Sequence, residues 1–533
     1  MTMGGQCKVL AVVVLFVWVV VSQGCRAQTG NLTRSTFPKG FVFGTAGSAY
    51  QYEGVVKDDG RGPSIWDKFA HTFGNLKSLS PRGKIIDFSN ADVAVDQYQT
   101  TLKHKEYTED IQLMADMGMD AYRFSIAWSR IFPYGAGEVN QAGINHYNNL
   151  INALLAKGIE PYVTLYHWDL PQALEDNNDY AVYAEICFKA FGDRVKHWIT
   201  FNEPHIIAVQ GYDSGMHAPG RCSVFLYCKQ GNSSTEPYIV AHNIILAHAT
   251  VSEIYRTKYK AKQNGQLGIS FDVIWCEPMS NSAADVEATK RAQEFQLGWF
   301  ADPFFFGDYP AVMRSRVGNR LPRFTAKEAA VVKGSLDFMG INHYTTFYTK
   351  DDKSSIIKKL LNDTLADIGT ISVPFRNGKP IGDKANSIWL YIVPTSMRTL
   401  MNYVKDRYNA PRVYITENGM DDSNSPFISL KNALKDDKRI KYHNDYLTNL
   451  AASISEDGCD VRGYFVWSLV DNWEWTSGYT SRFGLYFVDY RDSLKRYPKN
   501  SVQWFKNLLA SGRGSSRLNR IMAPPRNYDV LYM

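Results

Sequence analysis

Residues 413–419, Val-Tyr-Ile-Thr-Glu-Asn-Gly, decide how the rest of the chain is interpreted. The first three are β-branched or aromatic, which is typical of a strand that is buried on both faces. Asn418-Gly419 is a turn signal, so the strand is predicted to end at Glu417. This places a carboxylate at the carboxyl end of a buried strand.

Residues 197–204 have the same construction, His-Trp-Ile-Thr-Phe-Asn-Glu-Pro, with Glu203 at the predicted end of the strand. Pro204 prevents the strand from continuing. A lone glutamate at such a position is more often a solvated turn residue or a helix cap. Two of them, each beside an asparagine, favour a shared site, because parallel strands end at one edge of a sheet. Paired carboxylates across a sugar bond hydrolyse glycosides.

Strand-like and helix-like segments alternate along the chain. Short apolar runs predict strands at 41–46, 121–128, 161–168, 198–202, 267–275, 336–343, 413–417 and 461–469. Apolar residues three and four apart predict helices at 108–117, 144–156, 181–191, 237–259, 286–299, 388–408, 442–454 and 502–509. The pattern predicts the α/β class, as a single-domain (β/α)8 TIM barrel with long loop insertions, notably 211–236 and 346–386, at the C-terminal strand ends. A doubly wound open sheet is the alternative, but no Gly-rich phosphate turn follows the first strand.

The amino terminus has the features of a targeting segment. Lys8 precedes an apolar run at 9–21, and a cleavage site is expected near Ala27. Thirteen apolar residues are too few to span a bilayer, so residues 1–27 are predicted to be a signal peptide and residues 28–533 the barrel domain. We therefore expect a secreted protein of the extracellular space or cell wall, with the vacuole as the alternative and no membrane association after removal of the signal.

Two other features of the sequence are consistent with an oxidising compartment. Cys222 and Cys228 are six positions apart and are predicted to form a disulfide. Asn31, Asn232 and Asn362 each begin a glycosylation sequon and are predicted to lie on the surface.

The net charge of +6 is spread over interleaved basic and acidic residues. No basic stripe indicates a nucleic-acid partner. No metal-ligand spacing is present, and neither a metal nor another cofactor is expected.

Residues 200–204, Thr-Phe-Asn-Glu-Pro, and 415–419, Ile-Thr-Glu-Asn-Gly, resemble the two signatures of glycoside hydrolase family 1, and the chain is similar to its plant β-glucosidases over about 37–510. The resemblance implies a retaining β-glucosidase that hydrolyses terminal β-D-glucosyl residues from glucosides or short β-oligosaccharides. Glu203 matches the acid/base of the family, and Glu417 matches the nucleophile that forms the covalent glycosyl-enzyme.

The resemblance also implies a binding site for a small-molecule glycoside. The matching substrate-binding residues are Gln51, His167, Asn202, Tyr344, Trp467, Glu474 and Trp475; Arg123 and Asn342 match residues beside the nucleophile, and Trp389 matches a tryptophan that stacks on the leaving group. Alone, His167 is more often a core histidine and Arg123 a buried ion-pair partner. For Trp389, function and simple packing are equally weighted.

Two other functions use the same residues. A transglucosidase would pass the same intermediate to an acceptor hydroxyl instead of water. A carbohydrate-binding protein without catalysis is disfavoured, because both carboxylates are intact.

Overall fold

Eight parallel strands close into a barrel in the computed structural model, which describes residues 32–72, 85–97, 109–174, 180–224, 227–352 and 362–511. The barrel strands are β1 (Val42–Ala46), β2 (Ala121–Ser125), β3 (Glu160–Tyr166), β4 (His197–Asn202), β5 (Gln266–Pro278), β6 (Phe338–Asp351), β12 (Val413–Asn418) and β14 (Val461–Trp467). They pair in chain order, and β14 returns to β1 to close the ring. The predicted TIM barrel is confirmed.

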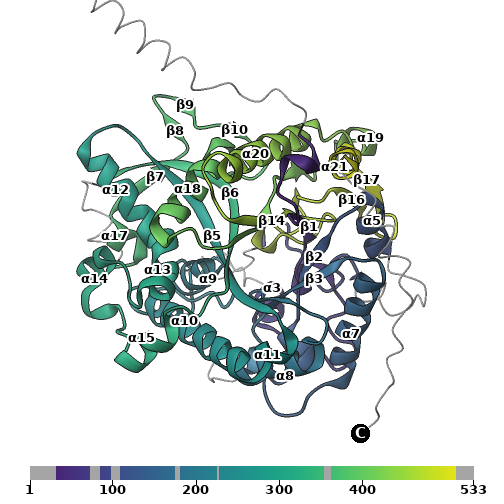
Figure 1. Ribbon diagram of the computed structural model, residues 1–533, viewed down its shortest axis with the longest axis horizontal. Coiled ribbons are helices and arrows are strands. Elements are labelled where there is room, and N and C mark those ends of the chain that lie inside the picture. The colour runs from purple at the N-terminus through teal and green to yellow at the C-terminus, as the bar shows by residue number, and fades with distance from the viewer. Residues whose placement is uncertain are drawn as a thin grey trace, which may run out of the picture.

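Helices surround the strands (Figure 1). The main ones are α5 (Glu109–Met117), α7 (Gln141–Ala156), α8 (Tyr180–Phe191), α10 (Glu236–Ile254), α12 (Ala283–Gln293), α13 (Trp299–Phe306), α18 (Thr395–Tyr408), α20 (Asp437–Ser455) and α21 (Asn500–Ala510). In α7, the side chain of Asn140 caps the first turn by accepting from the Ala142 N–H, and Ile144, Tyr147 and Ile151 form part of a buried stripe. Such stripes pack the helices against the barrel and leave its strand ends free to carry the site.

Some predicted boundaries are wrong. The helix predicted at 388–408 begins only at Thr395, because Pro394 disfavours helical geometry in the residue before it. The strands predicted at 121–128, 161–168 and 461–469 end at Ser125, Tyr166 and Trp467, where the chain turns into the loops above the barrel. Part of the predicted loop 346–386 is β-strand, since β6 extends to Asp351 and pairs antiparallel with β7 (Thr370–Val373).

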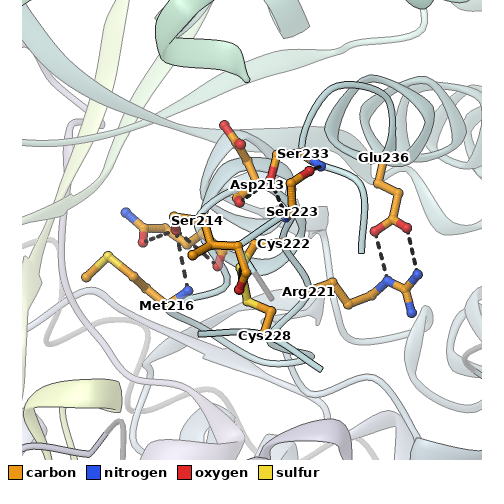
Figure 2. Close-up of a disulfide and its surroundings, with 11 residues drawn as sticks. Asp213, Ser214, Met216, Arg221, Cys222, Ser223, Cys228, Ser233 and Glu236 are labelled. Atoms are coloured by element: carbon orange, nitrogen blue, oxygen red, sulfur yellow. Dashed lines mark hydrogen bonds and ion pairs between the residues drawn. A yellow bond between two sulfur atoms is a disulfide. The ribbon is translucent and has the colours of Figure 1, made fainter. Parts of the chain in front are cut away.

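The predicted disulfide is confirmed. Cys222 and Cys228 are bonded, with their Cα atoms 5.5 Å apart and both side chains buried (Figure 2). Ser223 and Ser233 exchange main-chain to hydroxyl hydrogen bonds of 2.9 and 2.8 Å, and the Ser233 hydroxyl donates to the Asp213 carbonyl at 2.7 Å. The crosslink therefore fixes the long loop that leads into α10.

The remaining surface predictions are only partly covered by the described residues. Residues 1–27 and Asn31 lie outside them. Asn232 and Asn362 are exposed, as a glycan acceptor has to be. Within the described ranges, no helix combines the length and apolar character that crossing a bilayer requires.

Candidate active site

Glu203 and Glu417 lie in one buried hydrogen-bonded cluster at the carboxyl ends of β4 and β12. Asn342 on β6 connects them: its Nδ2 donates to Glu203 Oε1 at 2.8 Å, and its Oδ1 accepts from the Thr416 hydroxyl at 2.6 Å. Glu417 is the register partner of Asn342 across the β12–β6 ladder. The two glutamates are only 8% and 4% exposed. The predicted meeting of these distant residues is therefore found in the structure.

The backbone at Glu203 is unusual. The strand ends at Asn202, where the apolar run predicted as a strand also ends, and Glu203 follows it with a left-handed φ of +50°. Its N–H donates to the Ser270 carbonyl on β5 at 2.8 Å, and Pro204 begins the short helix α9 (Pro204–Ile206). A left-handed non-glycine residue costs about 1–3 kcal/mol and is concentrated at functional sites. We interpret this turn as the device that redirects the Glu203 side chain.

At the second glutamate, β12 departs from the prediction by one residue. The strand includes Asn418, which was predicted to be part of the turn. Asn418 is buried, and its side chain donates to the His343 carbonyl at 2.6 Å and to the Tyr442 hydroxyl at 2.9 Å. These bonds fix the strand end that carries Glu417.

A cation and a phenol hold the Glu417 carboxylate. Arg123 forms a buried ion pair with Glu417 Oε1 and donates to Asn202 Oδ1 at 2.6 Å. The Tyr344 hydroxyl donates to Glu417 Oε2 at 2.7 Å. Burial, followed by the charge of Glu417, raises the pKa of Tyr344 well above its ordinary value, so Tyr344 remains a donor.

The surroundings of Glu203 favour its protonated form. Burial has the largest effect and the charges of Glu417 and Asp272 add to it, so the pKa of Glu203 is well above its ordinary value. A protonated carboxyl beside an ion-paired carboxylate can donate a proton to a leaving oxygen while its neighbour attacks carbon.

A second polar group forms around Glu474. Gln51 Nε2 donates to Asn472 Oδ1 at 2.9 Å and to Glu474 Oε2 at 3.4 Å, and Trp467 Nε1 donates to Glu474 Oε1 at 3.2 Å. Among the described residues, the groups with the largest effect on this carboxyl include no cation, and burial raises the pKa of Glu474 to about 8. The group offers acceptors suited to sugar hydroxyls.

His167 joins the two parts of the site. Its Nε2 lies 3.1 Å from Asn202 Nδ2, and because an amide nitrogen only donates, Nε2 is the acceptor. Burial and the charge of Arg123 lower the pKa of His167 well below its ordinary value, so the ring is neutral. The ring stacks at 5.9 Å on Trp467.

Aromatic side chains line the rest of the region. Trp475 has a φ of +53° and packs at 4.5 Å from Trp168 and 6.0 Å from Tyr50, within an aromatic cluster. Trp389 is 37% exposed and meets Tyr344 edge-on at 5.9 Å, which places it on the solvent side of the residue that touches Glu417. The structure thus brings together all the side chains that were predicted to catalyse the reaction or to bind the sugar, with Trp389 at the outer edge of the group.

Asp272, Thr416 and Asn472 belong to the site but were not predicted from the sequence. Asp272 offered a signal, because it is a charged residue within the apolar run predicted as a strand at 267–275. Thr416 and Asn472 gave none, since their role depends on the folded contacts. No group of three or more metal-ligating side chains is found in the part of the chain that the structure describes.

Comparison with known proteins identifies the family. Residues 33–513 match the model for glycosyl hydrolase family 1. The chain belongs to glycosyl hydrolase family 1. The predicted family is therefore confirmed.

Similar family 1 proteins are close in sequence and structure. Beta-glucosidase 34 of Oryza sativa subsp. japonica is 79% identical over 522 residues, covering 95% of this chain and 99% of the relative. A mutant of rice Os3BGlu6 beta-glucosidase, solved in a covalent complex with Glc from GA4GE, is 74% identical with a TM-score of 0.85, covering 90% of this chain and 99% of that one. A beta-glucosidase of the fungus Humicola insolens in complex with glucose is 43% identical with a TM-score of 0.83, covering 90% and 99%.

Proposed function

We propose that this family 1 chain is a retaining β-glucosidase in which Glu417 is the nucleophile and Glu203 the acid/base. The observation that carries the proposal is the network in which Asn342 bonds Glu203 and Thr416 while Arg123 pairs with Glu417. It brings a carboxyl whose pKa is raised by burial and a carboxyl that is paired with an arginine into one buried cluster, which supports the proposed roles. The relatives named beta-glucosidase, and the one solved in a covalent complex with Glc, support the same reaction.

The reaction proceeds in two displacements. Glu417 attacks the anomeric carbon while Glu203 transfers its proton to the departing oxygen, which leaves as an alcohol. Glu203, now a carboxylate, takes a proton from water, and the water oxygen displaces Glu417 from the sugar. Arg123 and Tyr344 orient Glu417 for attack, because each touches one of its oxygens.

The sugar occupies the space between the two polar groups. Gln51, His167, Asn202 and Glu474 supply hydrogen-bonding groups for its hydroxyls, and Trp467 supplies an aromatic face. A site built this way discriminates by 10⁴–10⁵ against a sugar that lacks a bonded hydroxyl, because the buried partners are left unpaired. Trp475 shapes the wall, and the exposed Trp389 is placed to stack on the leaving group.

We also propose export of the chain from the cell, to the cell wall or extracellular space, with removal of residues 1–27. The Cys222–Cys228 disulfide supports this, because such bonds persist in oxidising compartments. The exposure of Asn232 and Asn362 supports glycosylation there. A reporter fused to residues 1–30 that stays in the cytosol would contradict export.

The catalytic assignment is tested with Glu203→Gln. Without its proton donor, hydrolysis of an aryl β-glucoside with a poor leaving group should fall by about 10²–10⁴. An activated dinitrophenyl glucoside, whose departure needs no proton, should still form the glycosyl-enzyme, and added azide should restore turnover by replacing water. Equal losses on both substrates with no azide effect would argue against Glu203 as the acid/base.

A further inference from the structure

Asp272 is a third carboxylate on the inner side of the barrel top. It lies on β5 in register with Asn342 of β6, the residue that donates to Glu203. Register partners on adjacent strands point to the same side of a sheet, so Asp272 faces the site with Asn342. The residue is only 7% exposed.

The two carboxylate oxygens of Asp272 differ in their hydrogen bonds. Its Oδ2 lies 3.0 Å from His205 Nδ1 and 2.7 Å from Gln296 Nε2, and because a carboxylate only accepts, both nitrogens donate to it. Gln296 Nε2 also lies 3.1 Å from His205 Nδ1, which is then a contact between two donors. Gln296 also donates to the main-chain carbonyl of Asp272 at 3.2 Å. Oδ1 is buried, and within the described ranges no hydrogen-bond partner reaches it. A buried carboxylate oxygen without a hydrogen-bond partner costs free energy, so its presence here calls for a functional explanation.

One partner lies directly before a π-helical segment and the other lies within one. His205 lies on α9, two residues after Glu203, and a π-helical segment (Ile207–Gly211) follows directly. Gln296 lies within a second π-helical segment (Glu294–Gly298). Such segments are rare and are found mostly at functional sites.

Two residues of β5 hold the left-handed turn at Glu203. Ser270 accepts from the Glu203 N–H, and Asp272 accepts from His205.

We propose that Asp272 is a positioning residue for Glu203, which fixes the turn after Glu203 through His205. The inference rests on the proposed role of Glu203 as the acid/base. Asp272 forms no bond to the sugar, whereas Glu417 becomes the glycosyl ester. The contact between Asp272 and the turn is therefore available in both displacements.

The groups that face Glu203 come from several strands. Glu417 on β12 and Asp272 on β5 raise the pKa of Glu203 in addition to burial, whereas the Asn342 amide on β6 and Arg123 on β2 lower it. Tyr344 on β6 is a neutral phenol that is sensitive to the charge of Glu203. Asp272 itself is faced by His205 from α9 and by the neutral Gln296. Removing the Asp272 charge should therefore lower the pKa of Glu203.

The test is the pH profile of Asp272→Asn, which keeps an acceptor for His205 but removes the charge. For a glucoside with a poor leaving group, the alkaline limb of the kcat/KM profile should move to a lower pH by about 1 unit. Above the shifted limb, that substrate should lose about tenfold in kcat/KM, while the dinitrophenyl glucoside loses much less. An unmoved limb, or equal losses on both substrates, overturns the inference.

Two further variants separate the outcomes. In His205→Phe, Asp272 loses its N–H donor and its link to the turn, but the edge contact of the ring with Trp299 is kept, so kcat/KM should fall more for the substrate with the poor leaving group than for the dinitrophenyl glucoside. Equal losses on both substrates overturn the inference, even if Asp272→Asn fails to fold. In Glu203→Gln the alkaline limb should vanish, and a limb that persists would show that the acid/base assignment has failed. If the limb vanishes in Glu203→Gln but does not shift in Asp272→Asn, only the role of Asp272 is refuted.

The matched control is Asp302→Asn on α13. Asp302 is also buried, and it is bonded to Arg407 and Tyr408, outside the site. This variant should lower the melting temperature without moving the alkaline limb, whereas a comparable shift of the limb would overturn the specific role of Asp272.

Discussion

Glu474 should make the protein less stable as the pH rises, because it is a partly buried carboxyl with a raised pKa. Its pKa is raised from the ordinary 4.5 to about 8 by burial, in addition to the charges of Asp421 and Glu417. Between these pH values the unfolded chain loses this proton and the folded chain keeps it. The contribution of Glu474 to the free energy of unfolding therefore falls as pH rises from 4.5 to about 8, and is constant above.

The size of the effect follows from the same two values. At 1.36 kcal/mol for each pH unit, the interval from 4.5 to about 8 corresponds to a loss of up to about 4–5 kcal/mol. This is a large share of the 5–15 kcal/mol that is typical of folded proteins. Glu474→Gln does not titrate, so relative to the wild type it should gain most of this amount, about 3–4 kcal/mol, between pH 5 and pH 8 while losing activity.

The assay is thermal and urea unfolding of the wild type and Glu474→Gln at a series of pH values. The difference in free energy of unfolding between the two proteins should grow with pH, whatever its value at pH 5. Glu253→Gln is the control, because Glu253 is an exposed carboxylate on α10. A pH-independent difference for Glu474→Gln, or one that favours the wild type more strongly at pH 8, would refute the reasoning.

Three other variants test separate contacts. Tyr344→Phe removes one charge-assisted hydrogen bond to Glu417, worth about 1.5–3 kcal/mol, so kcat/KM should fall about 10- to 150-fold, and a change below twofold would contradict the contact. Trp389→Ala should raise KM for aryl glucosides by about tenfold with little change in the breakdown of a preformed glycosyl-enzyme, whereas equal effects on both steps would exclude a leaving-group role. Replacing Cys222 and Cys228 by Ser should cost about 2 kcal/mol of stability, measured by urea unfolding, and an unchanged unfolding midpoint would show that the crosslink does not stabilise the loop.

Strong local patterns made the barrel predictable. Each strand is a short apolar run, each helix has apolar residues three and four apart, and a turn signal or proline follows Glu417 and Glu203. Parallel strands all end at one edge, so the meeting of the two glutamates followed from the topology. The helix at 388–408 was placed too early because the apolar residues before Pro394 resemble a helix face, although Tyr391 and Ile392 form a short strand.

The details around the acid/base depend on tertiary contacts. Sequence cannot show that Glu203 leaves the strand in a left-handed turn, because that conformation is fixed by Ser270 on β5 and by Asp272 through His205. Asp272 stands out in its strand only as an isolated charge, and its partner Gln296 is 24 residues away in the chain. The fold could thus be predicted from periodicity, whereas the arrangement that tunes Glu203 required the structure.

The most direct measurement is to trap the glycosyl-enzyme. A 2-deoxy-2-fluoro-glucoside with an activated leaving group slows the second displacement more than the first, so the sugar stays on the nucleophile. Mass spectrometry of the digested protein should find the label on the peptide that contains Val413–Asn418, at Glu417. A label on another residue, or no label together with a product of inverted anomeric configuration, would contradict the mechanism.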